Sequence, residues 1–544
     1  MDCFSQAVDG LSDLLQQSDS SLELLPREPE HVRGHVLVAE AWNVTPHLET
    51  SLEIALRLAR SGYQVTYLHY GTRLSSVEFF FRDHFRLKEL LCWTLAPQRK
   101  GIRLLRELAK RLDLPIFVDS ARRFWFASRF SIPRSCLQSI ESLKALTTTA
   151  HPGLGLAVAS SLMTKTQDPD VTPLDHHGLC HQLAQDFVLS QSILANAIRR
   201  HPYQAVVLFN GRYACVKGAV TACKVAGIPV YYHERGSSFA SFSLRTFQPQ
   251  DRLELQKDIQ VAWSSCAPDI DRFAKAQQFF SDKRRGSDRI WTSFTSHQRL
   301  GAASPLLQGA RSRSSSGCLI TYFASSDDEV AATDDVYVRD PFEWTNQAEA
   351  LNALAASCSH HGHALIVRCH PHLRQKGPRL RKRWHELNFV DPAFLHCVTI
   401  VESGSAISTY ELLDASDVVV SYGSTVGVEA VYWGKPSVLL ANSFYDRLAS
   451  LYQPTGRSLL DQLLSNPAAL TVDPMSASPY GFYLQTYGID HCLYRPSSLF
   501  DGTLCGLKLQ TFDQAPLFRL LLLLRQRFVQ LLSRSKVFPR ADQV

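Results

Sequence analysis

The strongest chemical signal in the sequence is the segment SDVVVSYGSTVGVEAVYWGKP, which spans residues 416–436. Its pattern predicts a strand, a tight turn, a helix, a second turn and another strand. Ser424 is a suitable N-cap for that helix, and the backbone N–H groups at a helix start favour a bound phosphate. The hydroxyl groups of Ser424 and Thr425 can add hydrogen bonds, and Gly423 belongs to the same phosphate-binding turn.

Glu429 lies about one turn into the same helix, where its carboxylate can accept hydrogen bonds from a ribose. A phosphate site beside a ribose acceptor fits a nucleotide. The alternative is an ordinary capped helix that carries a surface glutamate, and this segment alone does not separate the two interpretations.

A second segment, RCHPH at residues 368–372, ends the apolar strand HALIVRC. It lies at the carboxyl edge of the predicted sheet, where open parallel sheets bind ligands. Arg368 and His370 are two residues apart and face the same way in an extended chain, and this pair suits a pyrophosphate. Alone, the pair also fits a hydrogen-bonded histidine and a surface arginine at a strand end.

Two carboxylates in the first half of the chain are candidates for a catalytic base. Glu40 follows the first predicted strand, and Glu234 follows a later one in the sequence YYHERG. Either can take a proton from an acceptor hydroxyl, and the richer surroundings favour Glu234. Alternatively, Glu234 and Arg235 form an ion pair that pins a loop.

Candidate acceptor-binding residues lie beside these carboxylates. Asn210 and Arg212 end the predicted strand AVVLFN, and Arg235 follows Glu234. They can bind a sugar or an anionic acceptor, or only support the loop.

The elements that position these residues alternate between strands and helices, which predicts parallel sheets. Predicted strands cover 35–42, 64–70, 114–119, 205–210 and 228–234, then 318–324, 363–370, 398–402, 417–422 and 436–441. We expect an irregular segment over 1–30, an N-terminal acceptor domain over 31–303, a linker over 304–317, a nucleotide-donor domain over 318–450 and a mainly helical extension over 451–544.

Composition places the chain among ordinary folded proteins. It has 544 residues, of which 45% are hydrophobic and 20% charged, and its net charge of +6 is too diffuse to indicate nucleic-acid binding. The thirteen cysteines show no C-x-x-C spacing, the start lacks signal-peptide features, and no segment is apolar enough to span a bilayer. We expect a cytoplasmic protein with reduced thiols.

Metal and cofactor signals are weak, so we expect neither. Asp168-Pro169-Asp170 has the D-x-D spelling of a sugar-nucleotide metal site but follows no apolar strand. The pairs His176-His177 and His360-His361 lack a third ligand at a recognisable spacing and are taken as loop histidines.

The leucine-rich segment 517–532 carries basic residues near its end and is too short to span a bilayer. It fits a helix buried against the protein, or one that contacts acidic lipid at the inner face of the plasma membrane.

The R-x-H-P motif, followed about fifty residues later by SDVVVSYGSTVGVEAVYWGKP, resembles bacterial capsule polysaccharide biosynthesis proteins, and a related arrangement occurs in glycerophosphotransferases of teichoic acid synthesis. The segments FNGR at 209–212 and HERG at 233–236 are similar to parts of the same proteins. The resemblance covers residues 200–490 and is strongest over 363–441.

This resemblance implies an α/β protein of GT-B type, with two Rossmann-like domains facing across a cleft and a helical C-terminal tail. It implies a metal-independent glycosyltransferase, in which Arg368 and His370 contact the donor phosphates and Glu429 faces the ribose. The expected partners are a nucleotide-sugar donor and a polysaccharide or lipid-linked glycan acceptor. The alternatives are a phosphoglycerol or phosphoalcohol transferase with a CDP-linked donor, a sugar-nucleotide epimerase, and a catalytically silent binding protein.

Overall fold

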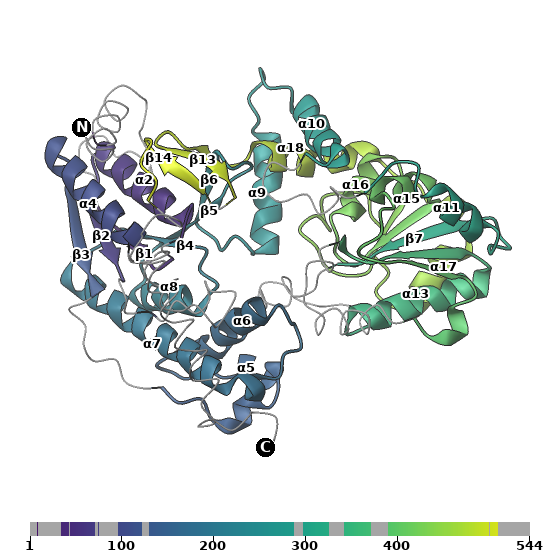
Figure 1. Ribbon diagram of the computed structural model, residues 1–544, viewed down its shortest axis with the longest axis horizontal. Helices are drawn as coiled ribbons and strands as arrows, with labels where there is room; N and C mark the ends of the chain where they lie inside the picture. The colour runs from purple at the N-terminus through teal and green to yellow at the C-terminus, as the bar shows by residue number, and fades with distance from the viewer. Residues whose placement is uncertain are drawn as a thin grey trace, which may run out of the picture.

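The computed structural model describes residues 8, 34–42, 44–70, 74, 96–121, 130–287, 298–325, 342–371, 390–499 and 501–509. Within these residues the chain forms a seven-stranded sheet, a five-stranded sheet and a small two-stranded sheet. The two large sheets lie on opposite sides of the molecule, with helices between and around them (Figure 1).

The first sheet has the strand order β12-β6-β5-β4-β1-β2-β3. Strands β1 to β5 are parallel in the order 3-2-1-4-5, which is the Rossmann order, and β6 and β12 add antiparallel strands at one edge. Its strands are β1 (His35–Glu40), β2 (Gln64–His69), β3 (Ile116–Ser120), β4 (Ala205–Phe209), β5 (Val230–Arg235), β6 (Ser241–Arg245) and β12 (Ile489–Asp490).

Helices cover both faces of this sheet, which explains why β1 and β4 are almost continuously apolar. In α4, leucines at 104, 105 and 108 point into the core while arginines at 103 and 106 remain exposed. One face carries α2 (His47–Arg60) and α4 (Ala96–Arg111), and the other carries α7 (His177–Arg200) and α8 (Ala214–Ala226). Against α7 pack α6 (Leu154–Thr166) and the 3₁₀ turn η6 (Pro173–His176), and α5 (Ile140–Lys144) and the 3₁₀ turn η5 (Arg134–Leu137) join the same apolar cluster through α6 and η6.

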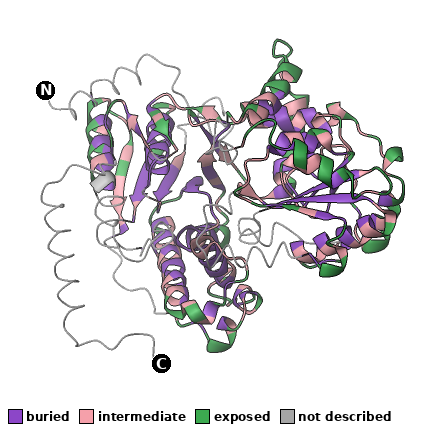
Figure 2. Cartoon of the chain, turned by 45° about the vertical axis from the view of Figure 1, so that its right-hand side comes forward, coloured by how far each residue is buried: buried purple, intermediate pink, exposed green. Residues whose placement is uncertain are grey.

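The second sheet is wholly parallel, with the strand order β11-β10-β7-β8-β9. Counted from β7, this is again the order 3-2-1-4-5. Its strands are β7 (Leu319–Phe323), β8 (Ala364–Arg368), β9 (Val398–Val401), β10 (Val418–Ser421) and β11 (Ser437–Leu439). Around it lie α11 (Ser304–Arg311), α13 (Gln347–His361), η9 (Pro392–Phe394), α15 (Thr409–Ala415), α16 (Val426–Tyr432) and α17 (Arg457–Ser465). Figure 2 shows the buried strands of both sheets between helices with exposed outer faces.

Three helices join the two halves of the molecule. Helices α9 (Arg252–Ser264), α10 (Arg272–Arg285) and α18 (Ser478–Thr486) share one apolar cluster with α16 of the second half. A buried ion pair between Arg252 of α9 and Asp446 adds a polar contact, and Gln256 Nε2 donates to the same carboxylate at 2.8 Å. These contacts fix α9 against the loop that follows β11.

The C-terminal extension returns to the first sheet. Its strand β12 pairs with β6, and the carboxylate of Glu53 on α2 accepts backbone N–H groups of Cys492, Leu493 and Tyr494 at 2.9–3.3 Å. The remaining elements are η10 (Pro467–Ala469), η11 (Pro474–Ala477), β13 (Tyr494–Ser498) and β14 (Asp501–Leu504).

The first sheet has a parallel core in Rossmann order and the second sheet is wholly parallel, which confirms the predicted α/β fold with two Rossmann-like sheets. Two details differ from the expectation. Residues 304–311 of the expected linker form α11, because Ala310 and its neighbouring leucines pack against the second sheet. The described part of the extension contains strands as well as helices, because β12 completes the edge of the first sheet.

The segments 1–7, 9–30 and 517–532 lie outside the described residues. Among the helices of the described residues, none combines the length and apolar character that crossing a bilayer requires.

Candidate functional site

An open pocket lies at the carboxyl edge of the second sheet. It contains about 720 Å³ of space that protein atoms do not fill, part of it open to solvent. Residues that follow β7 and β10 line it, and the strand order reverses between these two strands, which is where open α/β sheets bind ligands. The structure brings five sequence-predicted residues together around it: Arg368, His370, Ser424, Thr425 and Glu429.

Arg368 is the most unusual of these residues, because its side chain is fully buried. Its guanidinium donates to the backbone carbonyls of Glu402 at 2.6 Å and Ser405 at 3.5 Å, whereas its Nε has no hydrogen-bond partner. No carboxylate among the described residues forms an ion pair with it. Burial lowers the pKa of Arg368 to about 10, so the group still carries its charge at neutral pH. A buried cation without a counter-charge is costly, and an anion in the pocket would supply one.

His370 lies two residues after Arg368 and also lines the pocket, as the extended-chain argument predicts. Lys283, near the end of α10, brings a second cationic side chain to the wall from the helices that join the two halves. Sequence analysis missed Lys283, because only the fold brings α10 beside the second sheet.

The turn before α16 differs from the expectation. The N-cap is Thr425 and not Ser424, and its side chain makes no capping hydrogen bond. The cause lies in the backbone: the Ser424 carbonyl accepts the Gly427 N–H at 3.0 Å, and the Tyr445 hydroxyl also donates to it. The Ser424 hydroxyl accepts only a long contact from the Val426 N–H, at 3.5 Å.

Gly423 precedes this turn with a φ of +79°, a conformation that glycine adopts without strain. It shapes the turn and does not line the pocket.

We expect Ser424→Ala to change the free energy of unfolding by less than ~0.5 kcal/mol, because no capping bond is lost. Anion affinity should fall by about 1 kcal/mol if the hydroxyl donates to the ligand. Urea unfolding and a binding titration measure the two effects separately. A stability loss of ~1 kcal/mol, typical of a removed N-cap, would contradict this description of the turn.

Glu429 is buried in the pocket wall and does not stand on the surface. Its two carboxylate oxygens accept hydrogen bonds from the Tyr410 hydroxyl and from Thr425 Oγ1, the latter at 3.1 Å. Tyr410 belongs to α15, whose sequence carries no motif, so sequence analysis did not find it. Tyr410 and Thr425 hold the Glu429 carboxylate at the pocket wall, where it can also accept a hydrogen bond from a ligand hydroxyl.

At the carboxyl edge of the first sheet, Glu40 is fully buried. One of its oxygens lies 3.6 Å from His233 Nε2, and the other accepts the Trp42 N–H. Burial raises the pKa of Glu40, and the nearby His233 opposes that rise. The buried ring of His47 packs close by, and burial holds its pKa well below the usual range. Sequence analysis missed both histidines, since neither stands out before β1, β4 and β5 are placed side by side.

Glu234 is half-buried and is more accessible than Glu40. Its Oε2 accepts from Asn210 Nδ2 at 2.7 Å, and its Oε1 accepts the Arg235 N–H at 3.1 Å. Asn210 adopts a φ of +53° at the end of β4, and its Oδ1 accepts the Arg212 N–H at 3.3 Å. Two neighbouring strand ends therefore hold this carboxylate.

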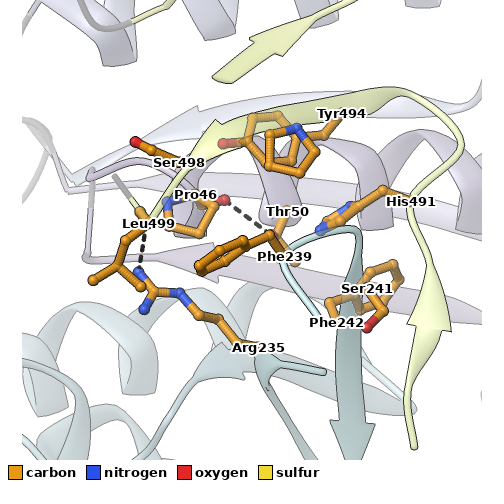
Figure 3. Close-up of a pocket in the computed structure, with 11 residues that line it drawn as sticks. Pro46, Thr50, Arg235, Phe239, Ser241, Phe242, His491, Tyr494, Ser498 and Leu499 are labelled. Carbon is orange, nitrogen blue, oxygen red and sulfur yellow. Dashed lines mark hydrogen bonds between the residues drawn. The ribbon is translucent and has the colours of Figure 1, made fainter. Parts of the chain in front are cut away.

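Arg212 and Arg235 contact different parts of the chain. The Arg212 guanidinium lies 4.6 Å from the centre of the Tyr213 ring and donates to the hydroxyl of that residue. The Arg235 guanidinium donates to the Leu499 carbonyl at 2.9 Å, beside a small cavity walled by Phe239, Phe242 and Tyr494 (Figure 3). Arg235 is therefore engaged by the C-terminal extension.

The D-x-D segment forms a turn after α6, in which Asp168 Oδ1 accepts the Asp170 N–H at 3.1 Å. The two histidine pairs lie at helix ends and not in loops: His176 and His177 at the start of α7, His360 and His361 in the last turn of α13.

No known protein family and no curated protein matches the chain. Among solved structures, the chain is similar to KpsC of Thermosulfurimonas dismutans, a beta Kdo 2,7 transferase, with 12% identity and a TM-score of 0.28 over 50% of this chain and 79% of that chain. It is also similar to a glycosyltransferase of Rickettsia africae, with 10% identity and a TM-score of 0.26 over 83% and 94% of the two chains. A UDP-GlcNAc 2-epimerase of Neisseria meningitidis gives 12% identity and a TM-score of 0.24 over 83% and 97%. Identities and TM-scores this low carry no information on activity or substrate.

Proposed function

We propose that the protein is a glycosyltransferase that moves a sugar from a nucleotide-activated donor to a capsule or other surface polysaccharide acceptor. The observation that carries this proposal is the buried guanidinium of Arg368, which lines the pocket of the second sheet and has no acidic partner among the described residues. The R-x-H-P motif and the segment after β10, whose sequences resemble capsule biosynthesis proteins, supply the walls of that one pocket.

The pocket suits a leaving group that gains negative charge. As the bond between the sugar and the nucleotide phosphate breaks, Arg368, His370 and Lys283 would stabilise the released phosphate by fixed positive charge and hydrogen bonds. The Ser424 hydroxyl would donate a hydrogen bond to the phosphate, and Thr425, whose hydroxyl donates to Glu429, would line the site beside it. The Glu429 carboxylate would accept a hydrogen bond from a ribose hydroxyl.

The first sheet would supply the base and the acceptor site. Glu234 would take the proton of an acceptor hydroxyl, which then attacks the anomeric carbon of the donor sugar. Its accessibility favours Glu234 over the fully buried Glu40. Asn210 would orient the Glu234 carboxylate, and the buried Glu40–His233 pair would link the carboxyl ends of β1 and β5.

A thermal-shift panel of UDP-, GDP-, CMP-, CDP- and dTDP-linked donors, with and without magnesium, tests this function. A ligand present at 100 times its Kd stabilises the native state by about 2.7 kcal/mol. We expect one donor class to raise Tm in the wild type and to raise it much less in His370→Ala. The control is His396→Ala, which alters an exposed histidine outside the pocket and should keep the full rise in Tm. No shift with any donor, or equal shifts in both variants, would contradict the proposal.

A further inference from the structure

We propose that His360, His361 and Asp461 form a binding site for a divalent transition-metal ion of the Zn²⁺ type. His360 and His361 end helix α13, and Asp461 lies in the middle of α17. The three potential ligand atoms, one from each residue, all lie within 4.8 Å of one another. Two imidazole nitrogens and one carboxylate oxygen form a ligand set that zinc, cobalt and nickel accept and that magnesium and calcium do not favour.

Two of the three distances between ligand atoms fit a tetrahedral ion, and the third, between the two imidazole nitrogens, is at most 4.8 Å. His360 Nδ1 lies 3.3 Å from Asp461 Oδ1, and His361 Nε2 lies 3.0 Å from the same oxygen. In a tetrahedral zinc site with bonds of about 2.0–2.1 Å, neighbouring ligand atoms are ~3.3 Å apart. Both imidazole nitrogens therefore already lie at a suitable distance from the carboxylate oxygen, and rotation of the exposed His360 ring can adjust their mutual distance, with a water molecule as the fourth ligand.

Neighbouring groups hold the cluster in place. Ser357 Oγ donates to Asp461 Oδ1 at 2.9 Å, in the manner of the outer groups that orient metal ligands. The His363 ring stacks beside His361, and its Nε2 is 2.7 Å from the Leu464 carbonyl of α17. The cluster is open on one side, because the His360 side chain is 70% exposed and that of His361 only 18%. An ion and its water can enter there.

The site is separate from the proposed reaction. Helix α13 ends immediately before β8 begins, so the cluster lies at the amino edge of the second sheet, whereas the pocket lies at its carboxyl edge. A bound ion would join α17 of the C-terminal extension to α13 of the donor domain. Its role would be structural: it would hold the extension against the sheet.

Sequence analysis found no third ligand because Asp461 lies 100 residues after His361. Only the packing of α17 on α13 brings the carboxylate to the histidines.

The test uses the full chain after dialysis against EDTA, with Zn²⁺ and Co²⁺ as the probes. We expect the wild type and His396→Ala to bind one more equivalent of zinc than Asp461→Asn and His361→Ala, and zinc to raise Tm only in the first two. Ser357→Ala, which removes a group that orients the Asp461 carboxylate, should weaken zinc binding by ~10–100-fold. Replacing Asp461 or His361 should weaken zinc binding by more than this.

Cobalt separates this site from the cysteines, because thiolate ligands give a charge-transfer absorption that nitrogen and oxygen ligands lack. The cobalt equivalent lost in Asp461→Asn should show no thiolate band. Equal zinc stoichiometry and affinity in the wild type and in both ligand variants, or no zinc bound by the wild type, would overturn the proposal.

Discussion

Replacing Glu234 by glutamine should lower the rate of sugar transfer by about 10²–10⁴-fold, the usual contribution of a general base. The amide has the same shape as the carboxylate, and its oxygen can still accept the hydrogen bond from Asn210 Nδ2, whereas the bond from the Arg235 N–H is lost because an amide NH2 group cannot accept one. The fold and the donor pocket of the second sheet should therefore be unchanged. Release of nucleotide from the donor, followed with and without acceptor glycan, measures the loss.

Glu40→Gln is the matched comparison, because it makes the same chemical change at the other candidate base. Glu40 is fully buried beside His233, so this variant should alter stability and its pH dependence more than transfer. Because burial raises its pKa, folded Glu40 keeps its proton to a higher pH than unfolded Glu40 does. Its contribution to stability is therefore fully present below the unfolded pKa and is lost as pH rises from there to the folded pKa. Transfer that survives in Glu234→Gln and is lost in Glu40→Gln would reverse the assignment.

Replacing Arg368 by methionine should weaken donor binding by about 10–100-fold, because hydrogen bonds to a charged group contribute ~1.5–3 kcal/mol. The unliganded protein should lose little stability, since the buried charge disappears and the Glu402 carbonyl keeps its hydrogen bond from the Ser405 N–H at 3.0 Å. A calorimetric titration and urea unfolding measure these two quantities.

Arg368→Lys is the control for charge, because it keeps the cation and loses the planar, two-pronged donor geometry. It should recover part of the affinity lost in the methionine variant. Donor affinity equal to wild type in Arg368→Met, together with a large loss of stability, would show that Arg368 only holds the Glu402–Ser405 loop.

Much of the fold follows from local sequence patterns. The apolar strands and the helices between them predict two parallel sheets, and the carboxyl ends of neighbouring parallel strands must meet at one edge. This is why Arg368, His370 and the turn at Ser424 could be placed together before the structure was known. Their spacing along the chain is irrelevant once β8 and β10 flank β7.

The details that sequence did not predict depend on contacts between distant segments. The capping role expected of Ser424 was wrong, because the Tyr445 hydroxyl and the Gly427 N–H engage its carbonyl and the helix begins one residue later. Tyr410 and Lys283 reach the pocket from helices without motifs. No local pattern reports such contacts.

We infer that the pocket beside Arg368 binds the phosphate of an activated donor, and a crystal structure of the complex with the nucleotide that stabilises the protein would test this. We expect a phosphate oxygen within hydrogen-bond distance of the Arg368 guanidinium, with His370 and Ser424 beside it. A nucleotide bound elsewhere, with Arg368 contacting only the carbonyls of Glu402 and Ser405, would contradict it.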